Sequence, residues 1–341
     1  MLFIVAGPPG RFTDFCSAIV AQLVERVRGP SEVIRGNTPE EITRNLLRGA
    51  TPHSVVASHS PGGRIGRALE VARRPFVVAL DNPRTVLFDL VFRDGKELAT
   101  ATRMVASSCA SLLRLSKIPG GLVLKADQEG NDRTMLGIAI AKHLRFDVGR
   151  NDVADIVCKL GEADTSSKGE GPASWWDGLD QAERAIVSGA LDAYHDHSPD
   201  RGLGTINWAQ ELFFIGDQTA EPATGGVDIT GRARCLLRGP HIMLPPGDWS
   251  LTASLHFSSD AAEHGFVLEA TAGAALSRTV IRPGAGGLVE ANLSLALAEL
   301  SDEPVELRLY NERPAFGGHV SLLHVTAVPQ HAAGEGAPEI G

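Results

Sequence analysis

Long apolar runs, closely spaced cysteines and an excess of basic residues are all missing from this sequence of 341 residues. No stretch reaches the length of about 20 apolar residues that a membrane-spanning helix needs. The net charge of −9, from 32 Lys and Arg against 41 Asp and Glu, argues against a nucleic-acid partner, because basic side chains must neutralise phosphates. The four cysteines form no CxxC pair and no cluster with histidine, so we expect reduced core thiols instead of disulfides or a zinc site. They are Cys16, Cys109, Cys158 and Cys235.

The length and the ordinary composition predict about two globular domains. Hydrophobic residues make up 43% of the chain and charged residues 21%, which is enough for sizeable cores. The N-terminal stretch MLFIVAGPPG has no positive charge before its short apolar run, so we expect a buried strand there and a cytoplasmic protein. The expected divisions are a first domain over 1–197, a linker over 198–206, a second domain over 207–330 and a disordered tail over 331–341.

The first part of the chain alternates short apolar runs with helical patterns. The spacing of apolar residues over 13–28 predicts a helix, and Thr38-Pro39-Glu40-Glu41 has the chemistry of a helix N-terminal capping box. The apolar runs do not alternate with polar residues, which is typical of parallel strands covered on both faces. The pattern predicts an α/β domain with a parallel sheet. Its expected strands cover 2–6, 54–58, 76–80 and 122–125.

Beyond Ile206 the helical periodicity disappears and short β-type runs take its place. Turns rich in glycine and proline, such as Pro245-Pro246-Gly247-Asp248, separate these runs. Several short strands at this spacing predict an all-β sandwich of jelly-roll type. The expected strands cover 249–257, 265–270, 291–297, 305–310 and 320–328.

The turn Gly7-Pro8-Pro9-Gly10-Arg11 follows the first expected strand and precedes a helix. Such a turn is a general cradle for anions, because backbone N–H groups and the helix dipole point toward the ligand. This one departs from the pattern G-x-x-x-x-G-K-[ST], and its two prolines remove two N–H donors. A tight strand-to-helix turn without any ligand is the alternative interpretation.

Several further segments follow in a definite order. The second apolar run ends in His59-Ser60-Pro61, the third ends in Asp81-Asn82-Pro83-Arg84, and Ser167-Lys168-Gly169-Glu170-Gly171 precedes two tryptophans. Over about residues 1–200 this series resembles the sulfotransferase family. The resemblance implies a P-loop-type α/β fold and 3′-phosphoadenosine 5′-phosphosulfate as co-substrate, with no tightly bound cofactor. It also implies His59 as general base, and nucleotide contacts from Gly10, Arg11, Arg84, Lys168 and Gly169.

The departures from that family fall at its charged positions. Its loop lysine matches Pro8 or Pro9, its phosphate-binding arginine matches Asp81 and its serine matches Asp89. Two carboxylates would repel a phosphate that an arginine would attract. The sequence therefore leaves open a transferase acting on a cell-surface polysaccharide or glycolipid precursor, transfer from another nucleotide donor, and an inactive glycan-binding or scaffold protein. For His59 the alternative role is to hold a loop through hydrogen bonds.

The second domain offers candidates for sugar binding. The segment 237–249 reads as a strand, a Pro-Pro-Gly turn and a return strand bearing an aromatic residue, and it resembles a β-sandwich module appended to bacterial polysaccharide-biosynthesis proteins. Sugars bind aromatic faces together with planar polar side chains, so the expected partner of the chain is a small-molecule nucleotide or a glycan. The alternative places Trp249 and Tyr310 in the core. The candidates are Arg232, Arg234, Trp249, Arg308, Tyr310 and Asn311.

Overall fold

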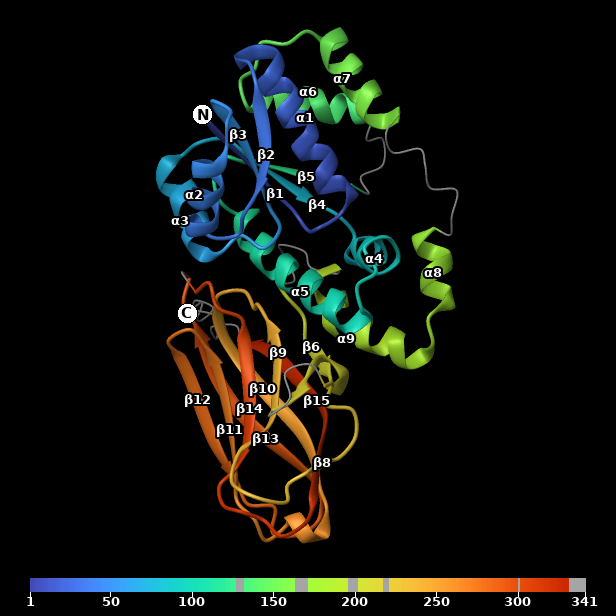
Figure 1. The fold of residues 1–341 in the computed structure, drawn as a ribbon, viewed down its shortest axis with the longest axis vertical. Coiled ribbons are helices and arrows are strands. Elements are labelled where there is room, and N and C mark those ends of the chain that lie inside the picture. The colour runs from blue at the N-terminus through green and yellow to red at the C-terminus, as the bar shows by residue number, and fades with distance from the viewer. Residues whose placement is uncertain (127–131, 163–170, 196–201, 217–220, 300, 331–341) are drawn as a thin grey trace, which may run out of the picture. The chain divides into compact units, whose positions relative to one another are not determined.

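The structure is a computed structural model that describes residues 1–126, 132–162, 171–195, 202–216, 221–299 and 301–330 (Figure 1). By its internal contacts the chain divides into unit 1, Met1–Arg184, and unit 2, Ala185–Gly341. The division lies inside helix α9 (Gln181–His195), before the expected boundary at residue 197. Residues 198–201 of the expected linker and all of the expected tail over 331–341 lie outside the described residues.

Unit 1 contains a parallel five-stranded sheet in the order β2-β3-β1-β4-β5. The apolar runs form strands as expected, because residues such as Val55 and Val78 are completely buried between two helical layers. Strand β2 was not predicted, since at the edge of the sheet its sequence SEVIR is only half-buried and mixes polar with apolar residues. The strands are β1 (Leu2–Ala6), β2 (Ser31–Arg35), β3 (His53–Ser58), β4 (Phe76–Leu80) and β5 (Gly121–Lys125).

Helices cover both faces of this sheet (Figure 1). One apolar cluster joins α1, α6 and α7 to the sheet through residues such as Ile19, Ile140 and Val153. A second cluster on the other face contains Ile42 of α2 and Leu69 of α3, together with residues of α5. The helices and the π-helical turn η1 are α1 (Arg11–Arg28), α2 (Pro39–Arg48), α3 (Gly63–Ala72), α4 (Pro83–Phe88), η1 (Asp89–Arg93), α5 (Leu98–Leu115), α6 (Arg133–His143), α7 (Arg150–Glu162) and α8 (Pro172–Gly178).

The predicted capping box forms at the start of α2, with one difference. The Thr38 hydroxyl accepts a hydrogen bond from the Glu41 backbone N–H at 3.2 Å, as the pattern requires. The Glu41 carboxylate, however, accepts from the backbone N–H of Asn37 at 2.8 Å, one residue before the cap. The reciprocal bond therefore fixes Asn37 at the carboxyl end of β2.

Unit 2 contains two antiparallel sheets, with the orders β13-β10-β15-β6 and β12-β11-β14-β9-β7, and β8 pairs with β15. Leu255 and Leu322 of the first sheet line the same small void as Leu268 and Leu307 of the second, so the two sheets pack face to face. The expected β-sandwich is present. Its strands are β6 (Ile206–Ala209), β7 (Phe214–Ile215), β8 (Val227–Asp228), β9 (Cys235–Ile242), β10 (Gly247–Phe257), β11 (Phe266–Ala272), β12 (Ala275–Ile281), β13 (Gly287–Leu297), β14 (Val305–Asn311) and β15 (His319–Gln330).

The Pro-Pro-Gly turn of the segment 237–249 joins the two sheets of the sandwich. Strand β9 before the turn pairs with β14, whereas β10 after it pairs with β13 and β15. The predicted strands on either side of the turn are confirmed, but they are not neighbours in one hairpin. In the described part of the chain, no helix combines the length and the apolar character that a membrane crossing requires.

Candidate functional site

The carboxyl end of β1 is the point where the order of the unit 1 strands reverses. Strand β3 lies on one side of β1 and β4 on the other, and ligands of open α/β sheets bind at such switch points. The backbone N–H of Gly7 donates to Ser58 O at 3.0 Å, which ties the turn to β3. A Cβ on Gly7 would lie 2.6 Å from the carbonyl oxygen of Ala79, so the close approach to β4 requires glycine.

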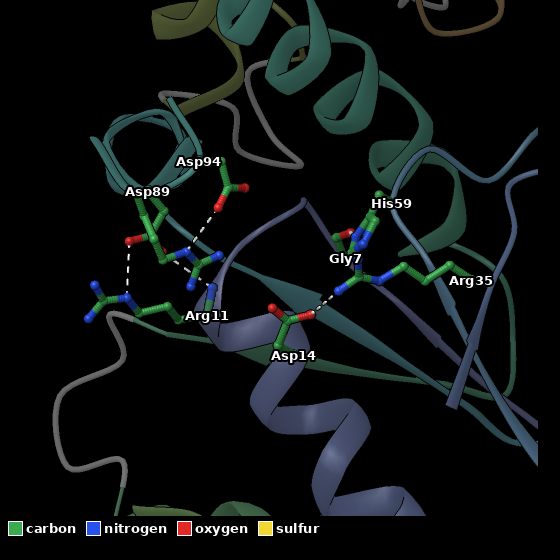
Figure 2. Close-up of polar contacts among 8 residues, drawn as sticks. Gly7, Arg11, Asp14, Arg35, His59, Asp89 and Asp94 are labelled. Atoms are coloured by element: carbon green, nitrogen blue, oxygen red, sulfur yellow. Dashed lines mark hydrogen bonds and ion pairs between the residues drawn. The ribbon is translucent and has the colours of Figure 1, made fainter. Parts of the chain in front are cut away.

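A carboxylate of the chain itself occupies the start of α1. Asp89 Oδ2 accepts the backbone N–H of Arg11 at 3.3 Å, and Asp89 Oδ1 lies 3.1 Å from Nε of the same arginine (Figure 2). The Asp89 side chain is only 5% exposed. It begins the π-helical turn η1, and Gly10 lies between this carboxylate and Val86. The positive end of the α1 dipole is therefore already matched by a buried negative charge.

His59 follows β3 and points its ring toward the turn after β1 (Figure 2). Its Nδ1 lies 3.2 Å from the carbonyl oxygen of Gly7. A carbonyl oxygen only accepts, so this bond assigns the proton to Nδ1 and leaves Nε2 as a hydrogen-bond acceptor. Burial lowers the pKa of His59 below its usual value, against the opposing effect of the Gly7 hydrogen bond. Burial thus favours the neutral ring, in which Nε2 has a lone pair for a proton.

Asn37 holds the His59 loop, and sequence reasoning missed it. Its Oδ1 accepts three hydrogen bonds, from the backbone N–H of His59 at 2.9 Å, the backbone N–H of Ser60 at 3.0 Å and the Ser58 hydroxyl at 3.2 Å. The Ser108 hydroxyl donates to the carbonyl oxygen of His59. The available signal was the position of Asn37 directly before the capping residue of α2.

Arg84 is the remaining predicted nucleotide contact that the structure describes. The Arg84 guanidinium lies 4.0 Å from the ring centroid of Trp176, over its face. Asp81 accepts the backbone N–H of Asn82 at 2.7 Å and so shapes the turn after β4. Lys168 and Gly169 lie outside the described residues. Of the predicted set, Gly10, Arg11 and His59 remain near the switch point, and none of the residues described there belongs to a cluster able to hold a metal ion.

In unit 2, three of the predicted sugar contacts have structural partners. Trp249 is 2% exposed and its indole N–H donates to Pro245 O at 3.0 Å. Asn311 is also 2% exposed and its Oδ1 accepts the backbone N–H of Arg234 at 2.7 Å. The Arg234 guanidinium donates to Asp228 O at 2.7 Å and Thr230 O at 2.8 Å. The exposed Arg232 lies in the same loop region, where its carbonyl oxygen faces the Asn311 amide.

Tyr310 and Arg308 lie instead on the outer face of the β12-β11-β14-β9-β7 sheet. Register places Arg278, Glu269, Arg308 and Arg238 in one row across four strands. Arg308 pairs with Glu306 at 2.5 Å, and this hydrogen bond is the main cause that raises the pKa of Arg308. A hollow of about 650 Å³ opens beside Tyr310. Its charged lining consists of Glu269, Arg278, Arg282, Glu312 and Arg313.

Sequence reasoning missed most of this lining. The available signal was the alternation of Ser277, Thr279 and Ile281 with Arg278 and Val280 along β12, which indicates one buried and one outward face. We call the side chains of Glu269, Arg278, Arg282, Tyr310, Glu312 and Arg313 the outer-face cluster. Arg278 lies 3.5 Å from Glu269, and Arg282 lies 2.7 Å from Glu312.

Comparisons with known proteins give no family assignment. No family model matches the chain, and no curated protein matches it. A mouse sulfotransferase solved with PAP matches at 13% identity and a TM-score of 0.35, covering 49% of this chain and 65% of that one. A family 61 carbohydrate-binding module solved with β-1,4-galactotriose matches at 10% identity and a TM-score of 0.24, covering 37% of this chain and 88% of the module.

A third similar structure is the C-terminal family 6 carbohydrate-binding module of a laminarinase from Zobellia galactanivorans. It matches at 15% identity and a TM-score of 0.24, covering 36% of this chain and 98% of the module. The chain spans slightly less than two thirds of the sulfotransferase. Each TM-score lies below 0.5, so these likenesses carry no argument about function.

Proposed function

We propose that this chain is a glycan-binding protein that uses the outer-face cluster of unit 2 and does not transfer sulfuryl groups. The observation that carries the proposal is the hollow of about 650 Å³ beside Tyr310. Its size suits an oligosaccharide segment. Three arginines and two glutamates line it. The guanidiniums can donate to sugar hydroxyls and carboxylates, and the glutamates can accept from sugar hydroxyls. Tyr310 supplies an apolar ring face with a polar tip for the C–H groups of a sugar.

The charge of the hollow favours an acidic glycan. Its lining contains Arg278, Arg282 and Arg313 against Glu269 and Glu312. Each glutamate already lies beside one arginine, which leaves the third guanidinium as the excess positive charge. A uronic-acid unit would add the matching carboxylate, and a charge-assisted bond to a guanidinium is stronger than a neutral one.

The proposal for unit 1 rests on the Arg11–Asp89 pair. A phosphate at the start of α1 would meet the buried Asp89 carboxylate, which already accepts the backbone N–H of Arg11. Binding would require this carboxylate to leave the site or to take up a proton, and either change costs free energy. The cradle is therefore closed to the ordinary donor.

Sulfuryl transfer from 3′-phosphoadenosine 5′-phosphosulfate to a polysaccharide or glycolipid precursor is the second candidate, favoured by the geometry of His59. With Nδ1 held by Gly7 O, the neutral ring has Nε2 available to take a proton from an acceptor hydroxyl. Arg11 would contact the donor in this candidate, together with Lys168. The hydroxyl oxygen would attack sulfur as the bond from sulfur to the phosphate oxygen breaks.

Affinity electrophoresis tests the glycan proposal. The full chain should be retarded in gels containing polygalacturonate and less so in gels containing neutral galactan. Tyr310→Ala should weaken the apparent affinity about fivefold, since an aromatic contact contributes about 1 kcal/mol. Ser294→Ala is the matched control, because Ser294 is exposed on β13 in the other sheet. Equal retardation of the wild type and Tyr310→Ala would refute the proposed site.

Calorimetric titration with 3′-phosphoadenosine 5′-phosphate separates the two candidates. The wild type should show no binding tighter than about 1 mM, which corresponds to roughly −4 kcal/mol. Asp89→Asn removes the negative charge while keeping the shape and should gain affinity. Micromolar binding by the wild type would instead support the transferase candidate and contradict the closed cradle.

A further inference from the structure

A cavity in unit 1, unrelated to the glycan proposal, lies between helices α2 and α3 and the first residues of β1. Its volume is about 770 Å³, within the range of roughly 300–1,000 Å³ that is typical of small-molecule sites. Ile42 and Leu46 line it from α2, and Ile65 and Leu69 from α3. Residues three or four apart share one side of a helix, so one apolar side of each helix contributes to the lining.

The cavity reaches the amino-terminal edge of the sheet, where its lining becomes basic. Arg28 is the last residue of α1, Arg73 and Arg74 lie between α3 and β4, and Arg145 follows α6. All four are exposed. No acidic side chain belongs to the lining, and no ion pair joins any of the four guanidiniums to another residue in the described ranges. We call them the arginine rim.

Two members of the arginine rim hold an unfavourable backbone conformation. Arg73 has φ 49° and Arg145 has φ 58°, both in the left-handed region. Across the described residues, the remaining non-glycine residue with positive φ is His241. Glycine would adopt this conformation without the steric cost, and it is the usual residue where a helix ends in this way. An arginine at both positions places a guanidinium at the cavity despite that cost, and backbone strain of this kind clusters at ligand sites.

We propose that this cavity binds a single-chain lipid that carries a phosphate headgroup. The hydrocarbon chain would lie between α2 and α3, and the phosphate would lie against the arginine rim. Helices of 10 residues give walls about 15 Å long, comparable to an extended dodecyl chain. Several guanidiniums without a carboxylate match a phosphate, which offers several acceptor oxygens and more than one negative charge. A nucleotide fits the apolar walls poorly, because its base and ribose need polar partners that Ile and Leu do not provide.

Isothermal titration with dodecyl phosphate, kept below its micelle concentration, tests the proposal on the full chain. Dodecyl maltoside has the same chain and an uncharged headgroup, and inorganic phosphate has the headgroup charge without a chain. Dodecyl phosphate should bind at least about tenfold more tightly than either comparison compound. No binding of dodecyl phosphate, or equal binding of the maltoside, would overturn the proposal and would point to a protein partner or to unspecific hydrophobic adsorption.

Two variants locate the binding. Ala68→Trp fills the space between the helices, and Ala68 is exposed, so the helix can accept the larger side chain. This variant should show no binding of dodecyl phosphate at any tested concentration. The double variant Arg73→Gly with Arg145→Gly preserves the left-handed backbone and should bind dodecyl phosphate about tenfold more weakly, with the maltoside unaffected.

Arg48→Gln serves as the matched control, since Arg48 is an exposed arginine in the last turn of α2 that does not line the cavity. It should bind dodecyl phosphate as the wild type does. Circular dichroism should confirm the helical content of each variant. Wild-type affinity in both Ala68→Trp and the double arginine variant would place the ligand elsewhere and overturn the assignment of the site.

Discussion

The two edges of the parallel sheet in unit 1 arrange their charges in opposite ways. At the carboxyl edge, polar groups are paired within the chain: Asp89 with Arg11, and Asn37 with the His59 loop. At the amino edge, the arginine rim surrounds an apolar cavity and contains no carboxylate. At the edge where α/β folds usually bind ligands, the charged and amide side chains named here thus have partners within the chain, although the buried Thr13 hydroxyl beside Gly7 has none. The opposite edge has charge that only a ligand or solvent can match.

This difference indicates that contacts at the carboxyl edge support stability, whereas charges at the amino edge are available for binding. A buried polar group that loses its partner costs free energy, so a fully paired network rigidifies the chain. An exposed guanidinium in water costs little, and it keeps its interaction for an incoming anion. Substitutions at the carboxyl edge should therefore change stability, and those at the amino edge should change binding.

The largest effect on stability should come from Asn37→Ala. Three donors would lose their shared acceptor, and we expect a loss of about 2 kcal/mol in the free energy of unfolding. Urea titration followed by circular dichroism measures it. Asn45→Ala is the control, because the Asn45 side chain donates one bond, to Arg35 O at 2.6 Å, and should cost less. Equal losses of unfolding free energy in the two variants would contradict the role of Asn37 in holding the His59 loop.

Much of the fold could be predicted from the sequence because its signals are local. Uniform apolar runs gave β1, β3, β4 and β5, and the pattern Thr38 to Glu41 gave the start of α2. Strand β2 was missed because an edge strand buries less apolar surface and carries a weaker pattern. The sandwich was predictable from the spacing of its turns, but the pairing partners of β9 and β10 were not.

The candidate sites were less predictable because they depend on contacts between distant segments. Asp89 was matched to a phosphate-binding serine of the sulfotransferase family, but its bond to a backbone N–H 78 residues away, at the start of α1, requires the folded chain. Trp249 and Tyr310 looked alike in the sequence, and burial separates them, since one faces the core and the other lines a hollow. The cavity beside the arginine rim left no motif, because its residues come from five segments that meet only at the edge of the sheet.

A smaller and opposite effect is expected at the amino edge. Arg73→Gly removes the steric cost of the left-handed backbone, partly offset by the greater freedom of glycine in the unfolded chain, so the net gain in stability should be roughly 0.5 kcal/mol. Thermal unfolding with and without dodecyl phosphate separates the effect on stability from the effect on binding. Without the ligand the variant should unfold at a higher temperature than the wild type, and the ligand should raise its unfolding temperature by less. Destabilisation of the variant would show that the guanidinium supports the fold and would erase the contrast between the edges.

The smallest effect concerns the response of the two edges to pH. Burial lowers the pKa of His59 in the folded chain from the ordinary value of 6.5. The unfolded chain therefore binds a proton more readily, so the stability associated with the neutral ring is fully present above pH 6.5 and is lost as pH falls below it. His59→Gln lacks this titration. The stability of the variant relative to the wild type should therefore rise as the pH falls from 8 to 5, and urea unfolding at both pH values measures this change. Arg73→Gly should show the same difference from the wild type at both pH values, because it leaves the His59 ring in place. If the difference in stability between His59→Gln and the wild type is the same at both pH values, folding does not disfavour the charged ring. That result would contradict the role of His59 as a neutral proton acceptor at the carboxyl edge.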